Sequence, residues 1–296
     1  MIVPLIGALR PKQWTKNLLV FVGIVFAQHA TDPALIARAV AGFFGFSLLA
    51  GTVYMVNDLR DIEADKLHPK KKKRPIASGR LAPGVAWAMV PVLLAVVGVI
   101  AWWLGTGYTA VLVAYLVTNL LYSFGLKHQV ILDVFMIAAG FVLRAVAGVE
   151  LLKPVAPEVQ ISSWLLVCTF FGALFLGVSK RSRELANAGA NATQQRSVLA
   201  SYTPELLDRM LTIAAACTIM SYALYTIWPA TVAKFGTEAL IVTTPLVAYG
   251  VFRYLHLVKV SETSEDPSQV LLSDRPIQAT VALFVALALW ILYHAR

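Results

Sequence analysis

The segment NDLRDIEAD (residues 57–65) leads into the basic segment KKKKRP (residues 70–75), in a chain that is otherwise strongly apolar. On an α-helix, at about 100° per residue, four oxygen-bearing side chains would share about a quarter of the circumference: Asn57, Asp58, Asp61 and Asp65. Mg²⁺ takes such hard oxygen ligands together with water and substrate phosphates, and the cations that follow would hold those phosphates. The alternative is a solvated loop that only orients a membrane protein.

The composition indicates an integral membrane protein. Of 296 residues, 58% are hydrophobic and only 14% are charged, whereas soluble domains carry roughly 25% charged residues. Long apolar runs between short polar loops favour helical spans over a β-barrel, whose alternating segments are only ~10 residues long. The net charge of +9 lies in short loops, so it predicts topology and does not favour binding to nucleic acid.

The apolar runs predict an all-α fold with nine transmembrane helices in a single polytopic domain that covers residues 1–296. Residues 1–16 form an interfacial segment, because a cleavable signal peptide would not be followed by so many further spans. Turn residues, mostly proline and glycine, lie at or near the ends of the helices. We expect the nine helices at about 17–31, 35–56, 82–104, 108–125, 130–150, 161–179, 210–228, 238–257 and 276–294.

The distribution of lysine and arginine predicts the orientation. Of the 25 basic residues, 20 lie on one side together with the N-terminus, and four lie on the other: Arg38, Lys153, Lys234 and Arg296. Cytoplasmic loops carry the excess of positive charge, so the N-terminus is expected in the cytoplasm and the C-terminus outside. The candidate catalytic loops, all on the cytoplasmic side, are 57–81, 126–133, 180–209 and 258–275.

These loops carry further polar residues beside the acidic segment. Tyr122 and Lys127 bracket one short loop, and the next long one begins with Lys180, Arg181, Arg183 and Glu184. Together they suit a substrate with several phosphates, because positioning and charge neutralisation dominate such chemistry. Simple anchoring by positive charge on the cytoplasmic side is the alternative for each basic set.

Asp133 and Arg144 are unusual because they lie within a predicted span. They are eleven residues apart, about three helical turns, and therefore lie on one stripe with Ile137 and Gly140. An unpaired charge deep in the membrane costs at least ~2.5 kcal/mol, so Arg144 must face the interior of the bundle. A structural ion pair and a role in substrate binding both remain open for it.

The motifs resemble those of the UbiA superfamily of intramembrane prenyltransferases. The likeness is carried by the nine spans, by N-D-x-x-D-x-x-x-D from Asn57 running into K…RP-x-x-S-G, and by Y-x-x-x-x-K from Tyr122. Within that superfamily the chain is similar to the members that attach phosphoribose to a polyprenyl phosphate. This closer likeness lies in residues 9–17, Asp133 with 140–144, 179–185 and Glu265-Asp266-Pro267.

One departure from the superfamily pattern separates two activities. Aromatic prenyltransferases of the superfamily carry a second D-x-x-x-D after the sixth helix, whereas this chain has Lys180-Arg181-Ser182-Arg183-Glu184 there. A basic second site suits a substrate with an additional phosphate, such as the 5-phosphate of phosphoribosyl diphosphate (PRPP). The departure therefore favours phosphoribosyl transfer.

The resemblance implies a Mg²⁺-dependent transfer of 5-phosphoribose from PRPP to a polyprenyl phosphate such as decaprenyl phosphate. Asn57, Asp58, Asp61 and Asp65 would bind Mg²⁺, and Asp58, Asp61 and Lys127 are the catalytic candidates. The candidates for binding substrate are Lys12, Lys16, Asn57, Arg74, Tyr122, Arg144, Lys180, Arg181, Arg183 and Glu184.

The expected setting is the plasma membrane of a bacterium, with the site facing the cytoplasm and a product used for the cell wall. The lipid bilayer is the expected surrounding, nucleic acid is not an expected partner, and a homo-oligomer is left open. Three alternatives remain: an aromatic prenyltransferase using polyprenyl diphosphate, a secondary transporter, and a non-catalytic scaffold. A transporter would place its polar residues near the midplane in paired halves, whereas here they crowd one face of the membrane.

Overall fold

The computed structural model describes residues 2–29, 31–67, 71–188, 197–260 and 273–294, and these residues form helices without any strand. They divide into two units. One comprises residues 1–119 with 143–160, and the other 120–142 with 161–296. Helices α6 (Thr106–Phe124) and α7 (Leu132–Glu150) contribute residues to both units.

Within the described residues, eight helices are long and apolar enough to cross a membrane, so the chain has the character of a multi-pass membrane protein. The ninth predicted span, 17–31, is not among them. In its place are η1 (Pro11–Phe21), a 3₁₀ helix, and the short α2 (Val22–Phe26). A 3₁₀ helix of eleven residues is unusual, because such runs rarely exceed four residues.

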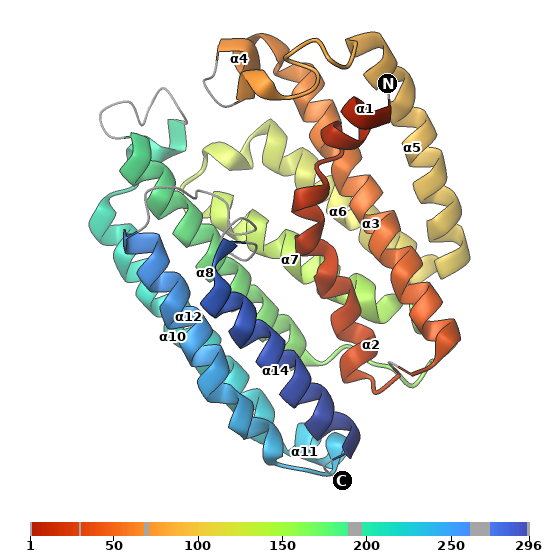
Figure 1. The fold of residues 1–296 in the computed structure, drawn as a ribbon, viewed down its shortest axis with the longest axis vertical. Helices are drawn as coiled ribbons and strands as arrows, with labels where there is room; N and C mark the ends of the chain where they lie inside the picture. The colour runs from red at the N-terminus through yellow and green to blue at the C-terminus, as the bar shows by residue number, and fades with distance from the viewer. Residues whose placement is uncertain (1, 30, 68–70, 189–196, 261–272, 295–296) are drawn as a thin grey trace. The chain divides into compact units, whose positions relative to one another are not determined.

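The first unit is built around α3 (Pro33–Arg60), which lies beside α5 (Pro83–Leu104) (Figure 1). Asp32 begins α3, since its carboxylate accepts hydrogen bonds from the N–H groups of Ala34 and Leu35 at 2.8 and 3.3 Å. The N-terminal α1 (Ile2–Ala8) and η1 also pack along α3. The buried core here comprises Ala8, Leu9, Met55, Leu59, Ile76, Leu81, Ala86 and Leu93.

Arg38 lies inside α3 and is only 6% exposed. Its guanidinium donates to the carbonyl of Leu104 at 2.6 Å and to that of Leu151 at 2.7 Å. Leu104 is the last residue of α5 and Leu151 directly follows α7, and such helix ends leave carbonyl groups without intrahelical partners. The sequence count assigned Arg38 to the side opposite to the N-terminus, and the structure adds that its side chain caps two helix ends inside the protein.

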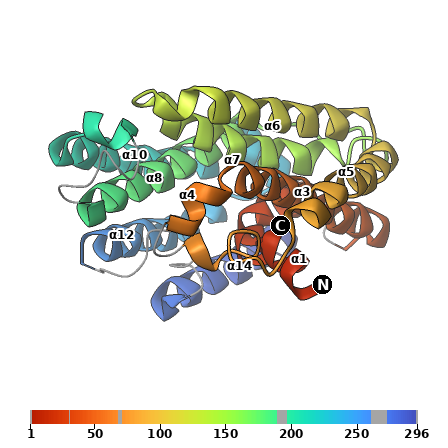
Figure 2. The same ribbon diagram turned by 90° about the horizontal axis from the view of Figure 1, so that it is seen from above.

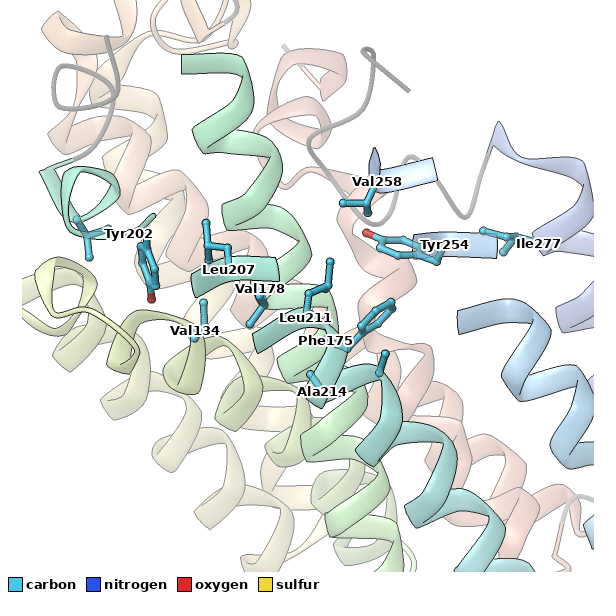
Figure 3. Close-up of a cluster of buried hydrophobic side chains, with 12 residues drawn as sticks. Val134, Phe175, Val178, Tyr202, Leu207, Leu211, Ala214, Tyr254, Val258 and Ile277 are labelled. Atoms are coloured by element: carbon cyan, nitrogen blue, oxygen red, sulfur yellow. The ribbon is translucent and has the colours of Figure 1, made fainter. Parts of the chain in front are cut away.

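The second unit is organised around α8 (Ser163–Ala188) and α10 (Pro204–Ile227), which lie side by side (Figure 2). Helices α12 (Thr244–Val260) and α14 (Arg275–His294) pack against each other. Figure 3 shows the buried side chains that fill this unit, among them Phe175 and Val178 from α8 and Leu207 and Leu211 from α10. These side chains form the buried core of the second unit.

Two predicted loops differ in the structure. The segment 180–209 is not one loop, because α8 continues to Ala188 and α10 already begins at Pro204. Polar residues near a helix end do not by themselves terminate the helix, so the span had been predicted to stop too early. In the predicted loop 258–275, the motif Glu265-Asp266-Pro267 lies outside the described residues, as does Lys70 of the basic segment.

Candidate active site

The acidic segment does not form one continuous helix. Helix α3 ends at Arg60 and α4 runs from Ile62 to Leu67, so the chain bends at Asp61, whose φ and ψ are −102° and 18°. The expectation that Asn57, Asp58, Asp61 and Asp65 share one helical face was therefore wrong, because the α-helical repeat is interrupted between them. Asp61 is exposed and Asn57 is half-buried.

Arg74 bridges two carboxylates that lie on either side of the bend, those of Asp58 and Asp65. Its Nη1 donates to Asp58 Oδ1 at 3.0 Å and to Asp65 Oδ2 at 2.6 Å. Both carboxylates are 2% exposed, so their negative charge is stabilised mainly by this neighbour and by Arg10, which donates to Asp58 Oδ1 as well. We call Arg10, Asp58, Asp65 and Arg74 the Asp58 cluster.

Arg10 is the member that the sequence did not single out. It lies in the left-handed region, with φ 52° and ψ 64°, directly before η1. Fewer than one non-glycine residue in ten has a positive φ, and those residues often occur at functional sites. The only signal in the sequence was its place in the stretch 9–17, because its pairing with Asp58 spans 48 residues.

The oxygen atoms of the acidic segment suit Mg²⁺ in kind, but the described carboxylates do not gather around one point. No group of three or more His, Cys, Asp or Glu side chains in the described parts of the chain could hold a metal ion. Asp58 and Asp65 are neutralised by arginines, and Asp61 lies on the surface at the bend. A divalent ion would thus share these carboxylates with Arg10 and Arg74 or displace them.

The two lysines of the N-terminal segment point in different directions. In η1, with three residues per turn, side chains four positions apart are separated by about 120°, compared with about 40° in an α-helix. Lys12 is exposed, whereas Lys16 is half-buried and donates to Gln13 Oε1. The 3₁₀ geometry therefore does not place Lys12 and Lys16 on one face, and their binding of phosphate remains a prediction.

Arg144 is buried in the first unit, where it is 5% exposed. Its Nε donates to Asn17 Oδ1 at 2.7 Å and its Nη2 to the hydroxyl of Tyr115 at 3.1 Å. The guanidinium also lies 5.0 Å from the centre of the Phe46 ring, a cation–π contact, and Asn17 donates to Ser47 at 2.9 Å. Arg144 thus joins η1, α3, α6 and α7. The contact of Arg144 with substrate stays a prediction.

Arg181 is the centre of a second ionic network, in the second unit. Its side chain is fully buried and donates to the carboxylates of Asp133 and Glu184, and at 3.4 Å to the hydroxyl of Tyr122. Tyr202 donates to the other oxygen of Asp133 at 2.7 Å. We call Tyr122, Asp133, Arg181, Glu184 and Tyr202 the Arg181 cluster. The two carboxylates of this cluster stabilise the buried guanidinium of Arg181.

Helix α8 directs its cations apart. At about 100° per residue, Arg181 and Arg183 lie on opposite sides of the helix, and Lys180 shares a face with Glu184. Arg183 is 5% exposed and donates to the carbonyls of Leu257 and Val258 at 2.7 and 3.3 Å, near the end of α12. Lys180 is half-exposed, with its Nζ 3.9 Å from Glu184. The predicted joint contact of these three cations with one phosphate is therefore not supported.

The loop that carries Lys127 is connected to the Arg181 cluster. Lys127 is half-buried in η3 (Leu126–His128), and four residues later Ile131 has a φ of 71°. A positive φ is strained for a β-branched residue, and the N–H of Ile131 donates to the hydroxyl of Tyr202 at 2.7 Å. Burial, together with the hydrogen bond to Asp133, raises the pKa of Tyr202 above its usual value. The neutral hydroxyl of Tyr202 therefore accepts a hydrogen bond from the loop at Ile131 and donates one to Asp133.

Comparison with solved structures defines the class of this protein. The fold matches a UbiA homolog from Archaeoglobus fulgidus bound to geranyl diphosphate (GPP) and Mg²⁺, with a TM-score of 0.72, coverage of 98% of this chain and 99% of that one, and 19% identity. The chain therefore has the fold of this UbiA homolog. The model of the UbiA prenyltransferase family matches residues 17–274, and the chain belongs to this family.

Two relatives define its place more closely. The chain is 38% identical over 227 residues to the decaprenyl-phosphate phosphoribosyltransferase of Mycolicibacterium smegmatis, covering 75% of this chain and 69% of the relative. It is 34% identical over 289 residues to the protein of the same name from Corynebacterium glutamicum, covering 95% of this chain and 84% of the relative. The family predicted from the sequence motifs is confirmed.

Proposed function

We propose that this protein transfers 5-phosphoribose from PRPP to a polyprenyl phosphate such as decaprenyl phosphate and releases diphosphate. The similarity to the two named phosphoribosyltransferases supports this activity. The observation that carries it in the structure is the Asp58 cluster, in which Arg74 bridges Asp58 and Asp65 beside the exposed Asp61. Paired guanidinium groups beside carboxylates suit a diphosphate that is accompanied by a divalent cation.

Asn57, Asp58, Asp61 and Asp65 are the residues that would hold Mg²⁺, which in such sites neutralises negative charge on phosphate oxygens. Arg74 is half-exposed, and its guanidinium would neutralise charge as it develops on the leaving diphosphate. Lys127 and Lys180 stay candidates for contact with phosphate because both side chains reach solvent. Arg181 and Arg183 would act indirectly by fixing the helix that carries Lys180.

The proposed reaction is a substitution at the anomeric carbon of the ribose. An oxygen of the acceptor phosphate forms a bond to C1 while the bond from C1 to the diphosphate oxygen breaks, and the electron pair leaves with the diphosphate. The acceptor phosphate is already ionised near neutral pH, so no strong general base is required. The site accordingly needs cations at fixed positions more than it needs a proton relay.

The proposed setting is the plasma membrane of a bacterium, with the site open to the cytoplasm, where PRPP is soluble. The polyprenyl tail would lie against apolar helix faces, and exposed side chains such as Val99, Trp102 and Val113 supply such surfaces. The excess of lysine and arginine on the side of the catalytic segments supports this orientation.

The deciding experiment incubates the purified protein with Mg²⁺, polyprenyl phosphate and PRPP labelled in the ribose. We expect a labelled lipid and the release of diphosphate. A second arm supplies an aromatic acid and polyprenyl diphosphate. Product in the second arm together with no labelled lipid in the first would replace the proposal with an aromatic prenyltransferase.

A further inference from the structure

The N-terminal segment is seated closely on α3. Gly51, Tyr54 and Asp58 follow each other at intervals of three and four residues and therefore form one stripe of the helix. A Cβ atom added at Gly51 would lie 3.0 Å from the carbonyl oxygen of Leu9, so the backbones approach as closely as glycine permits. Arg10 follows Leu9 in the chain, and its side chain reaches Asp58 at the C-terminal end of this stripe.

The backbone of Arg10 is held in a strained conformation from both sides. Its φ of 52° lies in the left-handed region, which glycine adopts readily and arginine does not. Leu9 is buried in the core of the unit, and its carbonyl accepts a hydrogen bond from Trp14 Nε1 at 3.1 Å. The carbonyl of Arg10 accepts one from the N–H of Gln13 at 2.8 Å. A strained backbone conformation persists only where the surrounding contacts hold it in place. Residues with such a conformation often occur at functional sites.

The guanidinium of Arg10 lies between an aromatic ring and a carboxylate. It is 4.8 Å from the centre of the Tyr54 ring and donates to Asp58 Oδ1, the same oxygen that Arg74 contacts. The side chains of Arg10 and Arg74 are 26% and 28% exposed, whereas that of Asp58 is 3% exposed. Two cations thus meet at one buried oxygen, with their outer parts in solvent.

This arrangement leaves donor capacity for a ligand. A guanidinium has five N–H donors in a planar fork, which matches phosphate oxygens in pairs. Arg10 directs a single N–H at Asp58, and Arg74 uses one nitrogen, Nη1, for both of its carboxylate contacts. Two adjacent forks fit two linked phosphate groups better than a single phosphate monoester.

We propose that Arg10 binds the diphosphate of PRPP together with Arg74. The identity of the ligand rests on the proposed function. Asp58 and Tyr54 hold the guanidinium in position before the ligand arrives, which reduces the entropy lost on binding. Arg10 therefore contributes to the affinity for diphosphate and not to the affinity for the lipid acceptor.

The test uses the purified full-length protein and inorganic diphosphate with Mg²⁺ as the probe. Arg10→Asn removes the guanidinium while asparagine still accommodates the left-handed backbone. Arg80→Asn is the matched control, because Arg80 is exposed in the same unit and donates to Ser78 Oγ at 3.0 Å. Dissociation constants are measured for diphosphate and, separately, for polyprenyl phosphate.

We expect Arg10→Asn to weaken diphosphate binding by about 10- to 100-fold, as expected for lost charge-assisted hydrogen bonds. Arg80→Asn should remain within about twofold of the unmodified protein, because exposed charges contribute little. The rise in melting temperature caused by diphosphate should shrink in Arg10→Asn, in line with its weaker binding. A purely structural role would lower the melting temperature without ligand and leave that ligand-induced rise unchanged.

An unchanged diphosphate affinity in Arg10→Asn would overturn the proposal, and so would an equal loss for both ligands. If Arg10→Asn does not fold, Arg10→Lys retains the charge without the fork, and we expect about 3- to 10-fold weaker diphosphate binding. An unaltered affinity there would equally contradict the proposal. If the unmodified protein binds diphosphate through Arg10 but forms no phosphoribosyl lipid, the proposed function fails while the assignment of Arg10 stands.

Discussion

The Asp58 cluster and the Arg181 cluster use the same kinds of side chain in opposite arrangements. In the Asp58 cluster two carboxylates are buried, and the side chains of Arg10 and Arg74 remain 26% and 28% exposed. In the Arg181 cluster the arginine is fully buried, with the carboxylates of Asp133 and Glu184 around it. The first cluster therefore leaves its cations partly accessible to solvent, whereas the second encloses its cation.

This contrast indicates that the exposure of an arginine, more than its residue type, decides whether it can bind a ligand or serves the fold. An arginine at the surface can exchange a carboxylate for a phosphate, because water replaces the contacts that it loses. A buried guanidinium cannot do so without leaving a charge unpaired in a medium of low polarity. We therefore expect substitutions in the Arg181 cluster to affect folding first, and those in the Asp58 cluster to affect ligand binding and turnover.

The largest effect on stability is expected for Asp133→Asn. It removes one of the two carboxylates around Arg181 and should destabilise the protein by about 3 kcal/mol, because one partner of a buried ion pair is lost. Asp208→Asn is the control, since Asp208 pairs with Lys259 at the surface and both side chains are 54% exposed. That control should cost at most about 1 kcal/mol. Thermal unfolding of the purified variants in detergent measures both, and equal losses would remove the distinction between the clusters.

Asp61→Asn tests the other side of the comparison. Asp61 is exposed at the bend after α3, so folding should be unaffected while turnover falls by about 100-fold or more through lost charge stabilisation in the site. Transfer of labelled ribose from PRPP is measured beside the melting temperature. Glu63→Gln is a suitable control, because Glu63 is exposed nearby and pairs with Lys66 at 2.7 Å. Full activity of Asp61→Asn would exclude the acidic segment from the reaction.

Tyr202→Phe sharpens the view that the Arg181 cluster positions the Lys127 loop. The variant loses the hydrogen bonds to Asp133 and to the N–H of Ile131, and should lower stability by about 1–3 kcal/mol because buried partners are left unsatisfied. Hydrogen exchange of the backbone amides around Ile131 should become faster. Exchange rates and stability equal to those of the unmodified protein would show that the loop is held by other contacts.

The smallest effect is expected for the partly buried pair of Arg253 and Asp274, which are 2.9 Å apart. The hydrogen bond from Arg253 lowers the pKa of Asp274 below its usual value. A lowered pKa in the folded state contributes stability above the unfolded value, near 3.9, and this is lost as the pH falls through the folded value. The melting temperature should therefore exceed that of Asp274→Asn at pH 7, and the difference should vanish in strong acid. A difference that persists there would point to another cause.

Much of the fold could be predicted from the sequence because lipid restricts the structures that a chain can adopt. Apolar length and charge placement were sufficient to predict an all-helical membrane protein, and the acidic and basic motifs were sufficient for its family. The nine-helix count was not supported, because composition does not distinguish the 3₁₀ helix η1 from an α-helix. Nor does it show that α8 continues past Arg181, since a helix can extend beyond the apolar core of a bilayer.

The amino-acid sequence is enough to say which residues bring charge to this membrane protein and in which segments they lie. Which of these residues are exposed and which are paired depends on how the helices pack. Arg10 and Asp58 are 48 residues apart, as are Arg181 and Asp133, and local periodicity carries no information over such distances. Packing of helices brings these groups together, and burial then decides whether an arginine holds the fold or is available to a phosphate.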